Sequence, residues 1–144
     1  MWRLTVDLTS CYPENARISH ADRQVWLADR DTVVVCDTVS ADSGPILKYH
    51  WHGHPDAAWW IEEGQALLYL DGTRLWVTCA GQTLEDGQID RLPGSRGQLT
   101  LSTEIADDIV WWVFTVGDRP SVVQEDKGLR VGERIFSRSV RSDV

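Results

Sequence analysis

Short runs of alternating apolar and polar residues cover most of the chain, and turn-forming residues separate one run from the next. Thr32 to Cys36 and Gln65 to Leu70 are typical, because each is rich in aliphatic or β-branched side chains and is bounded by Asp or Gly. No long segment has apolar residues at helical spacing. The pattern therefore predicts a protein built almost entirely of strands. The strands are expected at approximately residues 2–9, 22–28, 32–39, 45–54, 57–62, 65–70, 73–79, 88–92, 98–104, 109–116 and 129–136.

The clearest turn in this pattern is Asp71-Gly72, which separates the strands predicted at 65–70 and 73–79. An Asp-Gly pair suits a tight turn in which both central residues take positive φ. Glu62-Glu63-Gly64 predicts a second turn, so residues 57–79 should form a meander of three strands. The number and spacing of the strands favour an all-β fold with antiparallel sheets packed as a β-sandwich, and a cupin-like barrel is the alternative.

Length and composition are those of one soluble domain. A chain of 144 residues is near the usual domain size, and its hydrophobic fraction of 42% and charged fraction of 25% are ordinary. The strand pattern weakens after about residue 117, where Val122-Val123 and Leu129 to Phe136 are candidate edge strands. We expect a single β-sandwich domain over residues 1–136 and a flexible C-terminal tail over 137–144.

The formal net charge of −8 argues against polyanionic partners, because they bind basic proteins. Nucleic acids and acidic membrane surfaces require clustered Lys and Arg, so neither is expected to bind. No apolar run approaches the roughly 18 residues of a membrane span. Residues 1–5 lack the pattern of a secretory signal, so an exported parent protein would need a signal outside this chain.

Eight tryptophans and three cysteines stand mostly in apolar strands. Trp26, Trp76 and either ring of Trp111-Trp112 are expected to fill the core. Adjacent strand residues point to opposite faces, so one ring of Trp111-Trp112 and one of Trp59-Trp60 should leave the core unless both sheet faces are covered. An outward ring of Trp59-Trp60 could stack on a sugar or pack against another domain, and we favour the domain interface. The cysteines, expected to be small buried side chains without a disulfide or zinc site, are Cys11, Cys36 and Cys79.

Four motifs follow one another in the first third of the chain. They are Val6-Asp7-Leu8-Thr9 with Tyr12-Pro13, Arg23-Gln24-Val25-Trp26-Leu27, Thr32-Val33-Val34-Val35-Cys36-Asp37-Thr38-Val39, and Lys48-Tyr49-His50-Trp51-His52. This series resembles the β region of heparinase II/III-like proteins, where a "DLT.aYp" segment precedes an Arg-led strand, a "vvv.D.v" strand and a "w.lH" strand. The resemblance extends over about residues 4–115. From its position, Asp37 is expected to end its strand and to accept hydrogen bonds from turn N–H groups.

The resemblance implies the C-terminal β-sandwich part of a polysaccharide lyase, with the supersandwich type of fold. The parent would carry an upstream α-helical toroid, would be periplasmic or secreted, and would cleave uronic-acid polysaccharides by β-elimination. That chemistry needs a group that neutralises the uronate, a base and an acid. In the family these groups lie in the helical region and in a His-x-His-x-Asp element that precedes the matching segment. We therefore assign no catalytic residue to this chain and expect the toroid, and an acidic polysaccharide, as its partners.

His50, His52 and His54 alternate along a predicted strand and share one face if the strand stays extended. The first two could ligate one metal ion. The third lies roughly 13 Å from the first along a straight strand, so it joins them only if Gly53-His54-Pro55 bends. The candidates to complete such a site are Asp56, Glu62 and His20. No cofactor is expected, and a divalent metal at these histidines is the alternative. A packing or interface role for the histidines is favoured, because the resemblance implies a structural strand here.

Two alternatives to the lyase interpretation remain open. Gly44, His50 and His52 match the opening of the first cupin motif, which would make the chain a metal-binding enzyme. The cupin Glu should follow near residues 56–57, however, and no His follows the Pro93-Gly94 turn. A free-standing carbohydrate-binding module would instead rely on exposed Trp rings. The tyrosines are potential proton donors, but structural roles are favoured for Tyr12, Tyr49 and Tyr69.

Overall fold

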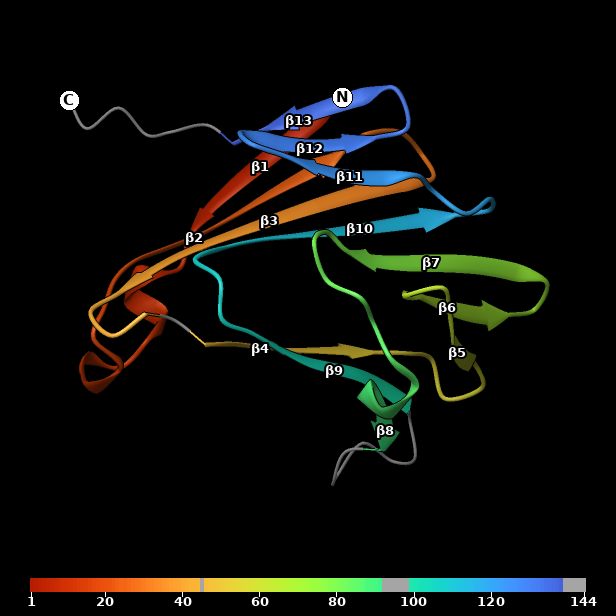
Figure 1. The fold of residues 1–144 in the computed structure, drawn as a ribbon, viewed down its shortest axis with the longest axis horizontal. Coiled ribbons are helices and arrows are strands. Elements are labelled where there is room, and N and C mark those ends of the chain that lie inside the picture. The colour runs from red at the N-terminus through yellow and green to blue at the C-terminus, as the bar shows by residue number, and fades with distance from the viewer. Residues whose placement is uncertain (45, 92–98, 139–144) are drawn as a thin grey trace.

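A computed structural model describes residues 1–44, 46–91 and 99–138 (Figure 1). These residues form strands and three short 3₁₀ helices, and the described part of the chain contains no α-helix. The strands are β1 (Trp2–Asp7), β2 (Ile18–Leu27), β3 (Thr32–Ala41), β4 (Leu47–His52), β5 (Ala58–Glu62), β6 (Gln65–Leu70), β7 (Thr73–Cys79), β8 (Ile89–Arg91), β9 (Leu99–Ile105), β10 (Ile109–Val116), β11 (Val122–Glu125), β12 (Gly128–Val131) and β13 (Arg134–Ser137). The 3₁₀ helices are η1 (Thr9–Cys11), η2 (Glu14–Ala16) and η3 (Asp86–Gln88). Among the described residues no helix is long and apolar enough to cross a membrane.

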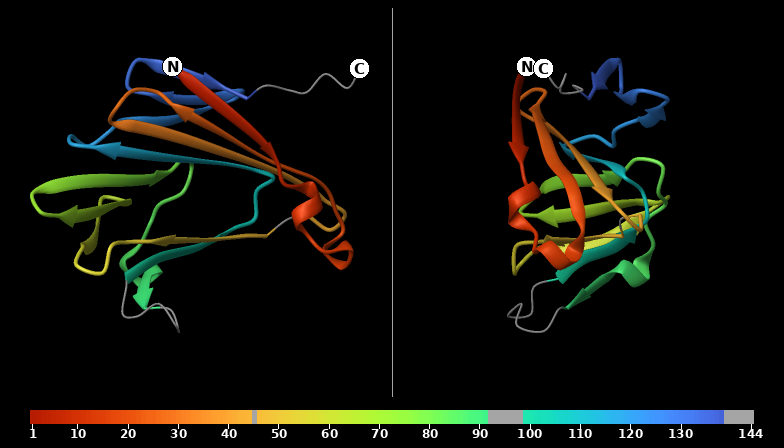
Figure 2. Two further views of the ribbon diagram at one scale, coloured as in Figure 1. Left: turned by 180° about the vertical axis from the view of Figure 1, so that it is seen from behind. Right: turned by 90° about the vertical axis from the view of Figure 1, so that its left-hand side faces the viewer.

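Three open sheets are stacked in layers. The central sheet has seven strands in the order β1-β2-β3-β10-β7-β6-β5. The sheet β4-β9-β8 faces one side of it, and the sheet β11-β12-β13 lies on the other side (Figures 1 and 2). The strand pairs are antiparallel. The predicted antiparallel sandwich is therefore confirmed, and the sheets do not close into the cupin-like barrel.

The two interfaces between the layers bury two groups of apolar side chains. Between the central sheet and β4-β9-β8 the buried residues are Val35, Tyr49, Ala66, Val77, Cys79, Leu84, Leu101, Ile105, Val110 and Trp112. On the β11-β12-β13 side they are Trp26, Val34, Cys36, Trp111, Val113, Leu129 and Phe136. Both faces of β3 and β10 are thus covered, which explains why these two strands are almost continuously apolar.

The adjacent rings of Trp111 and Trp112 belong to different interfaces. Trp112 is fully buried beside Tyr49 and Trp51 on β4, and Trp111 stacks on Trp26 at 5.4 Å between ring centroids. The sequence predicted opposite directions for this pair and left open whether the second face is covered. Because β11-β12-β13 covers that face, both rings lie in the core.

The predicted meander at residues 57–79 is present as β5, β6 and β7. Its second turn is Asp71-Gly72, whose φ angles are 49° and 79°. Positive φ at both central residues lets two adjacent strands keep their natural twist across a two-residue loop. The turn predicted at Asp71-Gly72 is therefore confirmed, and it joins β6 to β7.

The last third of the chain differs from the prediction. Residues 129–136 do not form one strand, because a two-residue turn at Gly132-Glu133 divides them into β12 and β13. Gly132 has a φ of 58°, which favours glycine at the first position of such a turn. Ser137 belongs to β13, and Arg138 Nη1 donates a hydrogen bond to Thr38 Oγ1 at 3.3 Å. The rest of the predicted tail, 139–144, and the Pro93-Gly94 turn lie outside the described residues.

The three cysteines are free thiols, and two of them are buried as predicted. Burial raises the pKa of both Cys36 and Cys79 to about 12, so these side chains are neutral at physiological pH. The prediction was wrong for Cys11, which is exposed in η1. Cys11 lies in the 3₁₀ helix that follows β1, the edge strand of the central sheet, and not in a strand of the core.

Candidate functional site

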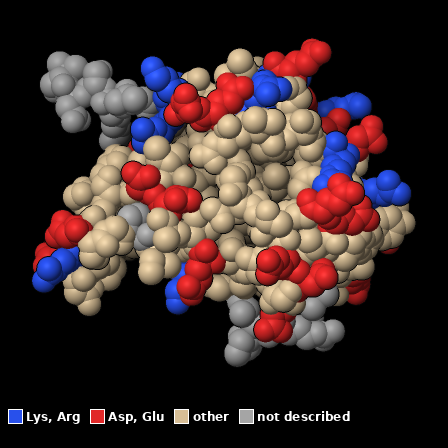
Figure 3. All heavy atoms as spheres, viewed as in Figure 1, with Lys and Arg blue, Asp and Glu red and all other residues tan. Residues whose placement is uncertain are grey.

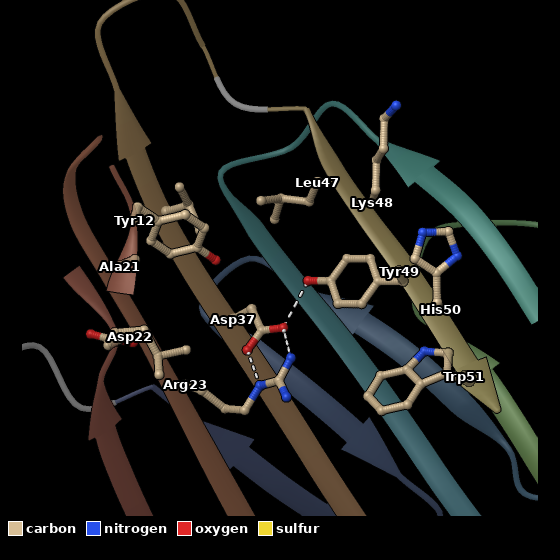
Figure 4. Close-up of a pocket in the computed structure, with 12 residues that line it drawn as sticks. Tyr12, Ala21, Asp22, Arg23, Asp37, Leu47, Lys48, Tyr49, His50 and Trp51 are labelled. Carbon is tan, nitrogen blue, oxygen red and sulfur yellow. Dashed lines mark hydrogen bonds and ion pairs between the residues drawn. The ribbon is translucent and has the colours of Figure 1, made fainter. Parts of the chain in front are cut away.

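A pocket of about 210 Å³ opens between β2 and β3 of the central sheet and β4 of the facing sheet (Figure 4). Its lining residues are Leu8, Tyr12, Ala21, Asp22, Arg23, Asp37, Val39, Leu47, Lys48, Tyr49, His50 and Trp51. Each of the four motifs that carry the family resemblance contributes to this lining, although the motifs are separate along the chain. The fold therefore brings the motifs together at one place, which makes this pocket the candidate site.

Strand register places the polar floor of the pocket. Arg23 on β2 and Asp37 on β3 are direct partners in an antiparallel pair, so both side chains project from the same face of the central sheet. Figure 4 shows that this face is turned toward β4. Tyr49 projects from β4 toward them, because it alternates with the exposed Lys48 and His50 on that strand.

Asp37 is the centre of a hydrogen-bond network that joins the two sheets. Arg23 donates to it twice, from Nε to Oδ1 at 2.7 Å and from Nη2 to Oδ2 at 2.8 Å. Tyr49 donates its hydroxyl to Oδ2 at 2.8 Å. The Asp37 side chain is only 8% exposed, and such two-point Arg–carboxylate pairs are strong and geometrically specific. The prediction that Asp37 ends its strand and binds turn N–H groups was wrong, because β3 continues to Ala41 and the partners are side chains.

The pKa values of the two donors follow from this network. The hydrogen bond to Asp37 raises the pKa of Arg23 and outweighs the lowering caused by burial. Burial raises the pKa of Tyr49 well above its ordinary value, and the negative charge of Asp37 adds to the effect. Tyr49 is thus held as a neutral phenol that donates to Asp37 and is unsuited to act as a base.

Aromatic rings form the walls of the pocket. The Trp51 ring lies 5.9 Å from the Arg23 guanidinium carbon and contacts Trp112 and Phe114 at centroid distances of 5.5 and 4.8 Å. Tyr12 stands on the opposite side, half-exposed, with its hydroxyl directed into the space in front of Asp37 (Figure 4). A guanidinium between a carboxylate and an aromatic face is held firmly in place.

Two other ionisable groups at the pocket have partners outside it. Lys48 Nζ lies 3.2 Å from Glu104 Oε1 on the outer face of β4, and Asp22 bonds His20 at 2.8 Å. Arg23, Asp37 and Tyr49 are bound to one another, so this network links the central sheet to the facing sheet at the pocket.

The predicted histidine cluster is only partly assembled. His50 and His52 share the outer face of β4, as expected, where their Nδ1 atoms lie 2.9 Å from the hydroxyl oxygens of Ser102 and Thr100. His54 follows the end of β4 and accepts a hydrogen bond from the Asp56 N–H at 3.1 Å. In the described part of the chain, no group of three or more His, Cys, Asp or Glu is arranged to hold a metal ion. A divalent metal at these histidines stays a prediction.

The two rings of Trp59-Trp60 point to opposite faces of β5, as predicted. Trp59 is partly buried against the cluster that includes Val77 and Leu101. Trp60 lies on the other face and is 37% exposed. The pair therefore supplies one packing residue and one surface ring.

Comparison of the sequence with family models and with curated proteins gives no match. Two solved structures of heparinase III, the BT4657 gene product, have a similar fold, and in one of them the lysines are methylated. Their TM-scores are 0.59 and 0.55 at sequence identities of 16% and 17%, and each comparison covers 94% of this chain. The chain spans about a quarter (25%) of the heparinase III chain. The likeness confirms the heparinase-like fold that the four motifs predicted.

Proposed function

We propose that this chain is a non-catalytic β-sandwich domain of a heparinase II/III-like polysaccharide lyase, and that the parent protein cleaves uronic-acid polysaccharides by β-elimination. The observation that carries the proposal is the fold likeness to heparinase III, which extends over 94% of this chain but only 25% of the larger one. A domain of this size would accompany further domains in a protein of heparinase III length.

The hydrogen bonds in the pocket support the non-catalytic part of the proposal. β-Elimination requires a cationic group free to neutralise a carboxylate and a base free to remove a proton. Arg23 is already neutralised by Asp37, and Tyr49 already donates to the same carboxylate. These two groups thus stabilise the contact between the two sheets.

An apolar surface on β1 and β2 supports the partner expected from the resemblance. Trp2 and Leu4 are 59% and 44% exposed and lie opposite Leu27 and Val25, so all four share one face of the central sheet. Val25 packs at the edge of the core beside β4-β9-β8, and the other three extend beyond it. Contiguous exposed apolar side chains mark interaction surfaces, and within this proposal the upstream α-helical toroid covers them.

The proposal is tested first by activity. The purified chain is incubated with heparin, heparan sulfate, hyaluronan and alginate, and the ultraviolet absorbance of unsaturated uronate products is followed. We expect no turnover with any polymer. Turnover that is lost in Tyr49→Phe or Arg23→Ala would assign chemistry to the pocket and contradict the non-catalytic role.

The proposed parent protein is tested by reading the genomic sequence around the segment that encodes this chain. We expect the genomic coding sequence next to this segment to encode a helical region with Tyr and His motifs. The two products, expressed separately, should form a complex that Trp2→Asp together with Leu4→Asp weakens. A genomic region that encodes no helical domain would overturn the assignment.

A further inference from the structure

The face of the central sheet on the β11-β12-β13 side is covered over only part of its width. That outer sheet packs on β2, β3 and β10 through the cluster containing Trp26, Val34 and Trp111. On β7 the chain itself provides the cover, because Trp76 Nε1 donates to the Gly117 carbonyl at 3.1 Å and the Arg119 guanidinium lies 5.5 Å from the Trp76 ring. Beyond this point the face is open around Trp60 on β5 and Tyr69 on β6, although Gln65 and Leu67 on the same face of β6 are buried.

Two aromatic rings lie together on this open area. Trp60 on β5 is paired with Leu67 on β6, and Tyr69 lies two residues beyond Leu67 on the same strand. Tyr69 is therefore a diagonal neighbour of Trp60, at a distance that a large side chain can span. The ring centroids are 6.4 Å apart and the planes are tilted by 40°. Trp60 and Tyr69 are 37% and 39% exposed, so the pair forms a shallow aromatic platform at the edge of the sheet.

Polar groups surround the platform. Trp60 Nε1 donates to Glu62 Oε1 at 3.1 Å, which fixes the orientation of the indole ring, and Arg74 lies opposite Tyr69 in the register of β6 and β7. A hollow of about 380 Å³ adjoins the Tyr69 side of the platform and is lined in part by His54, Asp56 and Asp71. Aromatic surface beside convergent hydrogen-bonding groups is the usual composition of a small-ligand site.

We propose that Trp60 and Tyr69 bind the pyranose rings of a neutral oligosaccharide. One face of a pyranose presents C–H groups that pack on an aromatic ring, and its edge presents hydroxyl groups that both donate and accept. The platform supplies the first contact. The carboxylates of Asp56 and Asp71 and the imidazole of His54 supply acceptors and a donor for hydroxyl groups that enter the hollow.

Charge decides between neutral and acidic glycans. The groups around the platform include the carboxylates of Asp56, Glu62 and Asp71 and the cation of Arg74, with Arg119 nearby at the Glu62 carbonyl, and the whole chain carries a formal charge of −8. On the side of the molecule seen in Figure 3, the Lys and Arg residues are scattered among Asp and Glu, without a continuous basic track. Such a surface repels a polyanion, so the ligand differs from the uronic-acid polymers expected of the parent.

The size of the patch favours a sugar over a protein partner. A stable protein interface removes roughly 800 Å² from each partner. Two side chains that are little more than a third exposed provide only a small part of that area. They match one or two sugar rings, and the Trp60–Glu62 hydrogen bond reduces the conformational freedom lost on binding.

The test is isothermal titration of the purified chain with cellohexaose, xylohexaose and mannohexaose, and with a heparin hexasaccharide as the acidic probe. We expect at least one neutral hexasaccharide to bind and the heparin fragment not to bind. Trp60→Ala and Tyr69→Ala should each weaken binding at least tenfold, whereas Trp60→Phe should retain most of it. Trp2→Ala is the matched control, because Trp2 is also exposed but lies on the opposite edge strand of the central sheet.

Three results would overturn the inference. They are failure of all three neutral hexasaccharides to bind, binding that survives both alanine substitutions, and a concentration-dependent dimer that Trp60→Ala dissociates. Near-ultraviolet circular dichroism of each variant establishes that loss of binding is not loss of folding. The result is independent of the proposed lyase parent, because the lyase tests depend on the pocket at Arg23 and on the surface at Trp2.

Discussion

Arg23 and Asp37 are direct partners across the β2–β3 pair, and their two hydrogen bonds of 2.7 and 2.8 Å form the floor of the pocket at which the four sequence motifs meet. Tyr49 bonds the same carboxylate from the facing sheet. The three residues therefore connect two layers of the sandwich through one buried charge.

Arg23→Ala should be strongly destabilising, because it leaves the Asp37 carboxylate buried with Tyr49 as its remaining donor. Removing one partner of a buried ion pair costs about 3 kcal/mol, and partial exposure of the Arg23 side chain places the effect near 2 kcal/mol. Urea denaturation measures the change. Arg30→Ala is the control, since the Arg30–Asp31 pair is exposed and should contribute under about 0.5 kcal/mol. Equal losses of unfolding free energy in the two variants would show that the Arg23–Asp37 pair does not stabilise the contact between the sheets.

Tyr49→Phe should change how stability depends on alkaline pH. Because burial and the charge of Asp37 raise the pKa of Tyr49 in the folded state, the phenol stays protonated there while it ionises in the unfolded chain above about pH 10. Its contribution is complete below that pH and is lost as pH rises further, at up to about 1.4 kcal/mol per pH unit. The free energy of unfolding between pH 8 and 11 should fall more steeply for the wild type than for Tyr49→Phe. Parallel curves would show that Tyr49 is not held as a neutral donor.

Gly53→Ala should destabilise the turn after β4 through a steric clash. A Cβ atom there would collide with the Trp59 indole nitrogen and lie 2.8 Å from Leu68 Cδ1, so ring and strand must shift. Overpacking of this kind costs about 1–3 kcal/mol. Gly87→Ala is the matched control, because a Cβ atom there meets no atom within 4 Å. Thermal melts should separate the two variants, and an unchanged melting temperature for Gly53→Ala would show that the turn has room.

Trp112→Ala and Trp60→Ala should differ greatly in stability although each removes the same side chain. Trp112 is fully buried between two sheets, so its removal should cost about 3–5 kcal/mol. Trp60 is a surface residue, and its removal should cost under about 1 kcal/mol. Chemical denaturation measures both values. A cost above 2 kcal/mol for Trp60→Ala would mean that this ring supports the fold and would weaken its use as a binding probe.

The features that depend on neighbouring residues were predictable from the sequence. The alternation of apolar and polar residues located β5, β6 and β7. Asp71-Gly72 located the turn between β6 and β7, because a two-residue loop needs a backbone conformation that few residue pairs adopt. Gly132-Glu133 carries a related signal, but the apolar residues on either side continue the alternation and hide it.

The features that depend on distant residues were not predictable in the same way. The pairing of Arg23 with Asp37 follows from the register of β2 on β3, which no local pattern specifies, so Asp37 was assigned to a strand end. Tyr49 reaches that carboxylate only because β4 belongs to a different sheet. A signal was available in the motifs themselves: an Arg and an Asp in separate apolar strands are costly to bury alone and favour mutual pairing.

The position of β10 couples the unfolding of the three sheets. This strand pairs with β3 on one side and β7 on the other, and its adjacent tryptophans anchor opposite outer sheets. Detachment of either outer sheet would expose one indole and loosen the strand that supports the other. We therefore expect the amide protons of β10 to exchange only through global opening, so that two separate cores melt in one cooperative transition.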